Sequence, residues 1–176
     1  MVTFSPEQRS IKVWSLETHK VLRTYEANGR ECRGEGDWPF LKWSFDSKYV
    51  ARLPEKGRIT VFEVPSMTLL GNKSIIANGC GQIAWSPSRS MLAYWCPEQN
   101  NVPAKVSVIS LPSRRLVAQK LLVNVQGVQM RWQKGGDFLE VKVNQLKPRT
   151  KTYLTNYEVF RFHGYTESFS SAPVVP

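Results

Sequence analysis

Cysteine and histidine are scarce in this chain of 176 residues, which contains three cysteines and two histidines. An odd number of cysteines with no CxxC spacing argues against a disulfide framework and against a zinc site, so we expect the reduced thiols of an intracellular protein. Two histidines are also too few for a histidine-rich metal or catalytic centre. The residues concerned are Cys32, Cys80, Cys96, His19 and His163.

Long apolar runs are missing too. No stretch approaches the roughly 18 consecutive apolar residues that a membrane-spanning helix needs. The N-terminal sequence, MVTFSPEQRS, lacks the basic and then apolar pattern of a secretory signal. We therefore expect a cytoplasmic protein that is not exported and has no membrane partner.

The sequence also lacks the motifs of common enzyme classes. No GxxxxGK[ST] phosphate loop is present, and GEG at 34–36 and KGG at 134–136 do not join a strand to a helix. Ser86, in AWSPS, does not stand in a GxSxG nucleophile elbow. We expect a non-catalytic chain with no metal, no cofactor and no small-molecule substrate.

Positive charge is abundant. The chain has 24 lysines and arginines against 14 acidic residues, a formal net charge of +10. Such an excess favours a polyanionic partner, either a nucleic acid or an acidic protein surface, and does not choose between them. With 41% apolar residues, the chain can still bury a sizeable core.

A repeated pattern organises most of the sequence. An apolar segment ending in tryptophan occurs three times, as FLKWS, QIAWS and QMRWQ. Each is followed by a polar turn, a second apolar segment and a third segment that alternates strictly, as in ITVFEV, VSVISL and YEVFRF. The fragment IKVWSL fits the third place as well. Alternation with a period of two is typical of β-strands. The tryptophans are Trp43, Trp85 and Trp132, and the third segments align Trp14, Phe62, Ile109 and Phe160.

A fourth strand follows the third segment. The stretches ITVFEVPSMTLL and VSVISLPSRRLV both place Pro-Ser between two apolar segments, which predicts a hairpin turn. A four-stranded antiparallel unit of about 40–50 residues is the blade of a β-propeller. We therefore predict an all-β propeller segment from a larger ring, with two complete blades and parts of two more. A β-sandwich is the alternative, and no segment has helical periodicity. The predicted blade parts are 1–27, 38–72, 80–123 and 127–162, with 163–176 as a tail or the start of the next blade.

The aromatic residues of the repeat have two interpretations. Exposed tryptophans stack on nucleic-acid bases, but an identical position in successive strands is what packing between blades requires. We favour packing, and predict a structural blade core of Trp14, Trp43, Trp85, Trp132, Phe62 and Phe160.

The basic residues in loops are candidates for contacts with phosphate groups. LKPRTK, residues 146–151, is the densest group and places Lys147, Arg149 and Lys151 in a predicted loop between second and third strands. Such a cluster binds phosphates without reading base sequence. The alternative is a solvated loop that keeps the chain soluble.

Three further basic residues are candidates for the same role. Lys105 is predicted on the same side of the ring as the 146–151 loop. Arg114 and Arg115 are predicted in a short turn on the opposite side, where a solvated turn is again the alternative.

The series WPFLKWSFDSKYVAR, LAYWCPEQNNVPAKVSVISLPSR, NVQGVQMRWQKGGDFLEVKV and TNYEVFRF resembles the β-propeller found in the B subunit of eukaryotic translation initiation factor 3. The resemblance runs from Val2 to Phe162, and WQKGGDFLEVKV is its most specific part. Members of this family are non-catalytic scaffolds with an RNA-recognition motif before the propeller and a helix after it. Neither of those two parts is recognisable in this sequence.

The resemblance implies assembly with other subunits of the factor and docking on the small ribosomal subunit, with contacts to rRNA and ribosomal proteins. Three alternatives remain: the propeller of an initiation factor 2A-type protein, a peptide-binding propeller of another assembly, and a propeller attached to an enzyme such as a serine peptidase. The last would require a hydrolase domain elsewhere in a longer chain.

Overall fold

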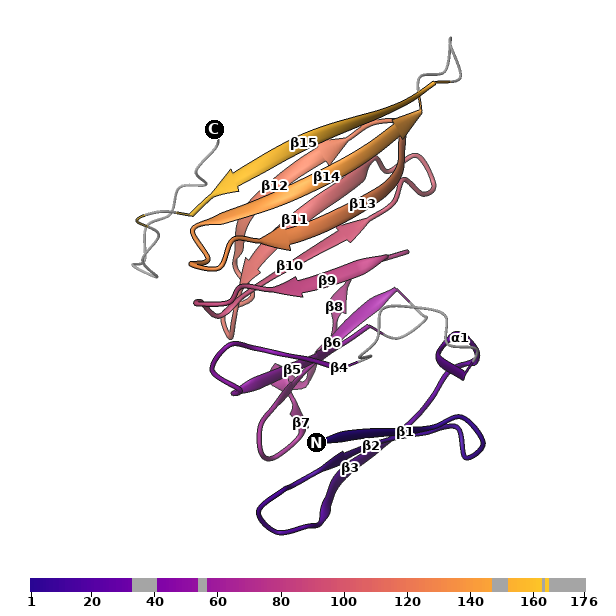
Figure 1. Ribbon diagram of the computed structural model, residues 1–176, viewed down its shortest axis with the longest axis vertical. Coiled ribbons are helices and arrows are strands. Elements are labelled where there is room, and N and C mark those ends of the chain that lie inside the picture. The colour runs from indigo at the N-terminus through magenta and orange to yellow at the C-terminus, as the bar shows by residue number, and fades with distance from the viewer. Residues whose placement is uncertain (33–40, 54–56, 147–151, 163, 165–176) are drawn as a thin grey trace. The chain divides into compact units, whose positions relative to one another are not determined.

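The computed structural model describes residues 1–32, 41–53, 57–146, 152–162 and 164, and its regular structure is almost entirely antiparallel β-sheet (Figure 1). The chain divides into two compact units. Unit 1 comprises Met1–Trp43 and Ser47–Ile76, and unit 2 comprises Ser44–Asp46 and Ala77–Pro176.

Unit 1 contains two antiparallel sheets whose strands follow one another in chain order. The first sheet has three strands. The second has the four strands of a predicted blade and a short fifth strand that pairs with the third of them. The first consists of β1 (Val2–Ser5), β2 (Ser10–Trp14) and β3 (Val21–Glu26). The second consists of β4 (Leu41–Trp43), β5 (Tyr49–Arg52), β6 (Arg58–Glu63), β7 (Thr68–Leu69) and β8 (Ile75–Ile76).

Three features of unit 1 differ from what the sequence predicts. A single helical turn, α1 (Gly29–Cys32), occurs where no helix was expected. The predicted fourth strand MTLL shortens to the two residues of β7 and continues as a 3-10 turn, η1 (Leu70–Asn72). The shortening has a local cause, since Gly71 has a φ of 54° and turns the chain out of the extended conformation. Strand β8 was not foreseen.

Unit 2 also contains two antiparallel sheets in chain order. The first is a complete four-stranded meander, and the second has three strands, of which the last two are the longest that the structure describes. The first consists of β9 (Gln82–Trp85), β10 (Met91–Cys96), β11 (Ala104–Ser110) and β12 (Leu116–Leu122). The second consists of β13 (Val125–Trp132), β14 (Phe138–Leu146) and β15 (Tyr153–Arg161).

The register of the sheets repeats in the way that the sequence predicts. In three of the sheets, the first strand ends in a tryptophan that pairs with an apolar residue of the second strand. That apolar residue pairs in turn with the third-strand residue that the repeat aligns. The rows are Trp43–Val50–Phe62, Trp85–Leu92–Ile109 and Trp132–Leu139–Phe160. The pair of Trp14 with Val21 matches the pair of Ile109 with Leu116, which joins the third and fourth strands of a blade. Each of the two pairs follows a bulge between the strands. The strands β1, β2 and β3 therefore correspond to the second, third and fourth strands of a blade.

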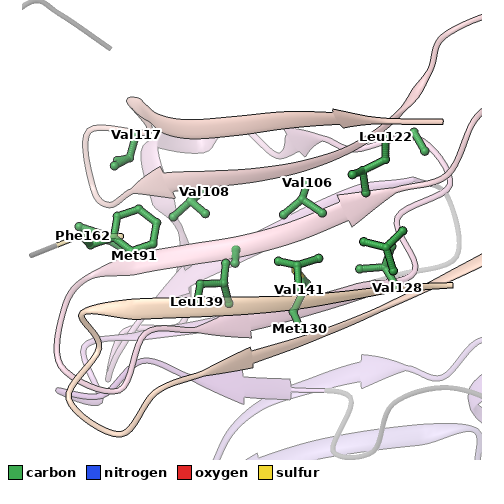
Figure 2. Close-up of a cluster of buried hydrophobic side chains, with 13 residues drawn as sticks. Met91, Val106, Val108, Val117, Leu122, Val128, Met130, Leu139, Val141 and Phe162 are labelled. Atoms are coloured by element: carbon green, nitrogen blue, oxygen red, sulfur yellow. The ribbon is translucent and has the colours of Figure 1, made fainter. Parts of the chain in front are cut away.

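Each unit has its own hydrophobic core. In unit 2 the core lies between the facing sheets β9–β12 and β13–β15, where β-branched and aliphatic side chains meet (Figure 2). The alternating residues Leu139, Val141 and Val143 of β14 are at most 1% exposed there. In unit 1 the core contains Ile11 and Val13 of β2 together with Val50 and Phe62 of the second sheet. Alternation along the strands thus decides which side chains are buried.

The fold class is the predicted one: the chain is an all-β segment of a β-propeller, with two sheets that hold all four strands of a blade and two that hold three. The four residue ranges proposed for the blades stay a prediction. The range 163–176 lies outside the described residues except for Gly164.

Candidate functional site

The densest predicted basic group, Lys147, Arg149 and Lys151, lies outside the described residues. The structure describes the two strands that this segment connects, and the last residue of β14, Leu146, pairs with the first residue of β15, Tyr153. The role of the three cations stays a prediction.

Arg114 and Arg115 lie in the short turn between β11 and β12, and both side chains are half-buried. The turn follows the cis bond Leu111–Pro112, and Arg114 has a φ of 58°. Hydrogen bonds hold it: the Ser110 backbone N–H donates to the Arg115 oxygen at 2.9 Å, and the Ser110 and Ser113 hydroxyl oxygens lie 2.8 Å apart. Two guanidinium groups are therefore placed on a well-braced turn.

The other Pro-Ser stretch adopts the same turn in unit 1. Its Val64–Pro65 bond is also cis, and Met67, the counterpart of Arg114, has a φ of 56°. The side chain of Met67 is only 1% exposed and belongs to the core of unit 1. The repeated sequence thus dictates the turn, while one residue decides whether the turn contributes apolar packing or positive charge.

Lys105 was predicted in a loop and lies instead in strand β11, where it pairs with Cys96 and Leu121. The reason is that the alternating segment VSVISL extends backwards through AK, so β11 begins at Ala104. Its side chain is half-buried.

The described candidate cations of unit 2 do not form one cluster. Lys105 lies near the beginning of β11, and Arg114 follows the end of that strand at Ser110. Five residues of extended strand separate Lys105 from Ser110, which corresponds to roughly 17 Å. The beginning of β11 lies at the end of unit 2 where β14 ends and β15 begins (Figure 1). Arg114 and Arg115 lie at the opposite end of the same unit.

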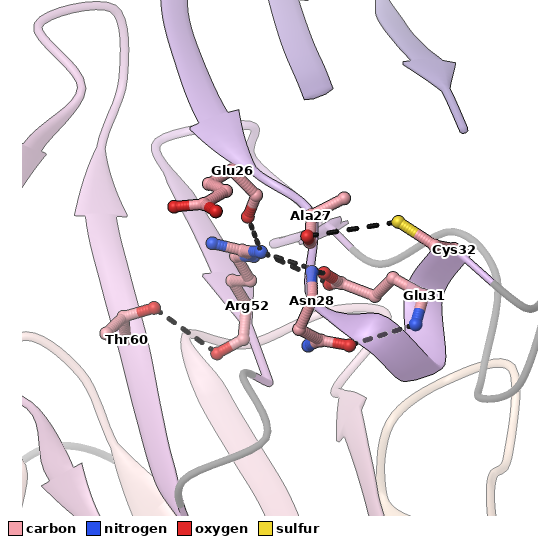
Figure 3. Close-up of polar contacts among 7 residues, drawn as sticks. All are labelled: Glu26, Ala27, Asn28, Glu31, Cys32, Arg52 and Thr60. Carbon is pink, nitrogen blue, oxygen red and sulfur yellow. Dashed lines mark hydrogen bonds and ion pairs between the residues drawn. The ribbon is translucent and has the colours of Figure 1, made fainter. Parts of the chain in front are cut away.

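A charged cluster that the sequence analysis missed is buried in unit 1. The Arg52 Nη2 group forms an ion pair with Glu31 Oε2 at 3.0 Å and donates to the Glu26 backbone oxygen at 2.7 Å (Figure 3). Glu31 and Asn28 cap α1 reciprocally: the Asn28 backbone N–H donates to Glu31 Oε2 at 2.8 Å, and the Glu31 N–H donates to Asn28 Oδ1 at 2.9 Å. The sequence signal was available, because Asn-x-x-Glu is the spacing of a capping box.

Two guanidinium groups flank the buried ring of Tyr25 in the same unit. Arg23 and Arg52 lie 5.3 and 5.2 Å from its centroid, and the Tyr25 ring lies 5.2 Å from that of Phe62. Arg23 Nη1 also donates to the Met67 backbone oxygen at 2.6 Å. Burial raises the pKa of Tyr25 from 10.0 to about 12, against the opposing effect of the Arg23 and Arg52 charges. The cluster joins the two sheets of unit 1, so its evident role is structural.

A second set of polar contacts joins the two sheets of unit 2. Arg89 forms an ion pair with Asp137 at 2.8 Å and also donates to the Phe162 backbone oxygen. The Ser88 hydroxyl donates to the Gly135 oxygen at 2.8 Å. Ser88, Arg89, Gly135 and Asp137 come from the first turn of each sheet, 47 or 48 residues apart in sequence, and Phe162 follows β15. The sequence predicts a turn at each of the four positions and does not pair them.

The aromatic residues of the repeat are half-buried, apart from Phe62, which is 6% exposed. Trp43 packs against the core of unit 1, and Trp132 and Phe160 pack against that of unit 2. Trp14 donates from Nε1 to the Thr3 hydroxyl at 2.8 Å, and Trp85 pairs with Leu92 in its sheet.

Within the described part of the chain, no three His, Cys, Asp or Glu side chains gather closely enough to hold a metal ion. None of the helices described there is long and apolar enough to cross a membrane.

Curated proteins of one name resemble this chain along most of its length. The B subunit of eukaryotic translation initiation factor 3 from Xenopus laevis is 35% identical over 167 residues, covering 92% of this chain and 23% of the relative. The protein of the same name from Schizosaccharomyces pombe is 34% identical over 172 residues, covering 90% of this chain and 24% of the relative. The chain thus spans about a quarter of the length of these relatives.

Solved structures resemble the fold. The crystal structure of a eukaryotic initiation factor matches with a TM-score of 0.65 and 22% identity, covering 90% of this chain and 41% of that one. Hydrazine synthase of Kuenenia stuttgartiensis matches with a TM-score of 0.64 and 16% identity, covering 91% of this chain and 47% of that one. At such identities the likeness concerns the fold alone.

No family model matches the chain. The resemblance to the curated relatives nevertheless extends over nine-tenths of its residues in both a frog and a fission yeast. Over nine-tenths of its length, the chain is thus similar to about a quarter of the length of the proteins named the B subunit of eukaryotic translation initiation factor 3.

Proposed function

We propose that this chain acts as a non-catalytic scaffold of translation initiation factor 3 in the cytoplasm, docking on the small ribosomal subunit during initiation. One observation carries the proposal: about nine-tenths of the chain aligns with proteins that carry the name of that factor's B subunit. The partners are then other subunits of the factor, rRNA and ribosomal proteins.

The charge of the chain supports contact with rRNA. A net charge of +10 attracts a polyanion at long range. RNA helices are met by proteins mostly through phosphate and 2′-hydroxyl groups, because their deep major groove hides the base edges. Basic side chains on turns suit such contacts, since each phosphate they neutralise releases bound counterions.

The placement of the basic residues supports two separate contact points. Arg114 and Arg115 lie on the braced turn at one end of unit 2. Lys105 lies near the other end, where β14 ends and β15 begins. A single RNA helix along one end of the unit would contact only one of the two groups.

The test measures co-sedimentation of the full-length protein with purified small ribosomal subunits over a range of salt concentrations. Two charge-reversed proteins are compared with wild type: Arg114→Glu with Arg115→Glu, and Lys147→Glu with Arg149→Glu and Lys151→Glu. Removal of each phosphate contact should reduce the slope of log K against log salt by about 0.7–0.9. Lys20→Glu is the matched control, because Lys20 occupies in unit 1 the position that Arg115 occupies in unit 2. The Ser15 N–H donates to the Lys20 oxygen, just as the Ser110 N–H donates to the Arg115 oxygen.

Weaker binding of either charge-reversed protein, with a reduced salt slope and an unchanged control, supports the proposal. Unchanged co-sedimentation of both charge-reversed proteins would show that these residues do not contact the ribosome. Binding that persists at high salt in wild type would favour a peptide-binding propeller. Absence of the other factor subunits from the purified complex would contradict membership in the factor.

A further inference from the structure

Two of the three cysteines, far apart in sequence, meet at one end of a hairpin in unit 2. Strands β9 and β10 pair Gln82 with Trp95, and the Gly81 N–H extends the ladder by donating to the Trp95 oxygen at 3.1 Å. The Gly81 N–H belongs to the peptide bond that follows Cys80, and the Trp95 oxygen belongs to the peptide bond that precedes Cys96, so this hydrogen bond brings the two cysteines together. The Cys80 thiol donates to the Gln82 oxygen at 3.4 Å, and each of the two thiols lies close enough to the other to shift its pKa.

The backbone places the two residues at a spacing that suits a disulfide. Paired residues of antiparallel strands have Cα atoms about 4.5–5.5 Å apart, and one residue along a strand adds about 3.3 Å. The Cα atoms of Cys80 and Cys96, opposite each other or one residue apart along the strand, are then separated by at most ~6 Å, inside the 4.4–6.8 Å range of disulfides. Cys80 precedes β9 in a turn, so strand alternation does not force its side chain away from Cys96.

The surroundings give the two thiols different properties. Cys96 is 5% exposed, whereas Cys80 is half-buried and reachable from solvent. The hydrogen bond from Cys80 lowers the pKa of Cys96, with a further contribution from the ammonium of Lys105, its partner in β11. The same hydrogen bond, together with burial, raises the pKa of Cys80. Cys80 is thus the accessible sulfur, and Cys96 is the sulfur that more readily becomes a thiolate.

We propose that Cys80 and Cys96 form a redox site that a disulfide oxidant such as oxidised glutathione closes into an intramolecular disulfide. The Cys80 thiolate attacks one sulfur of the oxidant, forming a mixed disulfide and releasing one glutathione thiolate. The Cys96 thiolate then attacks the Cys80 sulfur, and the second glutathione leaves as a thiolate. The protein loses two protons and two electrons, and oxidised glutathione becomes two molecules of reduced glutathione.

Cys32 is the natural control within the chain. It is half-buried at the end of α1 in unit 1, and its thiol contacts the Ala27 oxygen at 3.9 Å. Unlike Cys80, it has no cysteine partner among the described residues. A protein that oxidises without selectivity would involve Cys32 as readily as the other two.

The test incubates the purified full-length protein with mixtures of oxidised and reduced glutathione, then counts free thiols by alkylation in denaturant and maps tryptic peptides without reduction. Arg89 separates the two cysteines, so Cys80 falls in the peptide 74–89 and Cys96 in 90–105. We expect wild type and Cys32→Ser to yield one 74–89/90–105 cross-link that dithiothreitol removes, with the loss of two alkylatable thiols. Cys96→Ser should stop at a glutathione adduct on Cys80.

Other outcomes overturn the proposal. Full retention of the free thiols under strongly oxidising mixtures would show that the sulfurs do not approach each other. A cross-link that includes Cys32, or one between two molecules, would show unselective oxidation. If the Cys80→Ser and Cys96→Ser variants fail to fold, the wild-type peptide map still decides. Because none of these results concerns the ribosome, failure here leaves the proposed function standing.

Discussion

The indole of Trp132 donates a hydrogen bond from Nε1 to the backbone oxygen of Ala84 at 3.2 Å, which ties β13 to β9 across two sheets of unit 2. A second bond parallels it, from the Met130 N–H to Gln82 Oε1 at 3.1 Å. Strand edges in adjoining sheets are thus joined by polar contacts as well as by the apolar core. The tryptophan of the repeat has two functions here, as packing surface and as donor.

Replacement of Trp132 by Phe should separate these two functions. The ring would still pack against the core, but the Ala84 oxygen would lose its donor, which should cost about 1–2 kcal/mol of unfolding free energy. Trp132→Ala should cost more, about 3–5 kcal/mol, because it also leaves a cavity. Urea denaturation monitored by circular dichroism measures both. An unchanged stability in Trp132→Phe would mean that the hydrogen bond contributes nothing, and equal losses in the two variants would mean that ring packing contributes nothing beyond it.

Gly136 should not tolerate a side chain. It has a φ of +76°, and an added Cβ would overlap Ser88 Oγ and lie 3.0 Å from Ser86 Oγ in the facing turn. We expect Gly136→Ala to destabilise the protein by about 1–3 kcal/mol through strain and displacement of the turn. Gly127→Ala is the control, since a Cβ there meets nothing within 4 Å. A loss at position 127 as large as that at 136 would contradict the steric explanation.

The Arg89–Asp137 ion pair should be worth more than the Lys120–Glu158 pair of the same unit. Arg89 also bonds the Phe162 backbone oxygen, and its side chain is 26% exposed, whereas Lys120 and Glu158 are 46% and 36% exposed. Arg89→Met should cost about 1–3 kcal/mol, and Lys120→Met less than about 1 kcal/mol. Arg89→Lys should not restore stability, because a single ammonium replaces a planar fork of donors. Thermal unfolding of the three variants is the measurement.

Stability should fall in strong alkali because of Tyr25. Its pKa is about 12 in the folded protein, against 10.0 as the ordinary value. Below pH 10 the phenol is protonated in both the folded and the unfolded state, so the difference in pKa does not change the stability. Between pH 10 and 12 the unfolded chain releases its proton first, and the folded state loses up to about 2–3 kcal/mol.

Tyr25→Phe isolates that contribution. The Tyr25 hydroxyl is buried and has no hydrogen-bond partner among the described residues, so its removal should change stability by less than about 1 kcal/mol at pH 7. The difference between wild type and variant should then grow from pH 10 to 12 in favour of the variant. A constant difference over this range would show that Tyr25 titrates normally.

The rate of disulfide closure should rise with pH throughout the range 7 to 9. The first step requires the thiolate of Cys80, whose pKa is raised by the Cys96 hydrogen bond and by burial. A rate that levels off near pH 7 would indicate that the already thiolate-prone Cys96 initiates the reaction instead. Quenched alkylation time courses on Cys32→Ser distinguish the two.

The strands and their order could be predicted from the sequence, because they depend on local alternation and on a repeat whose copies align with one another. The positions of Trp43, Trp85 and Trp132 correspond in their sheets, as the spacing predicts, whereas the residues that pair with them are seen only in the structure. The two Pro-Ser turns share their backbone conformation for the same reason. Where a local signal was overlooked, as with Asn28 and Glu31, it was present in the sequence.

Contacts between sheets depend on the tertiary structure. Arg89 with Asp137 and the Trp132 indole with Ala84 are each 48 residues apart, close to the 47 residues from Trp85 to Trp132, but the repeat does not say which atoms meet. Arg52 and Glu31, on β5 and α1, are 21 residues apart and fall outside the repeat. Lys105 lies in β11 and not in a loop because the alternating segment extends back to Ala104, where it pairs with both neighbouring strands. The sequence by itself determined the fold class, most of the strands and the resemblance to the initiation-factor subunit. Only the tertiary structure decided which side chains meet across sheets, because the repeat gives the separation of equivalent positions along the chain, whereas the contacts follow from how twisted sheets stack.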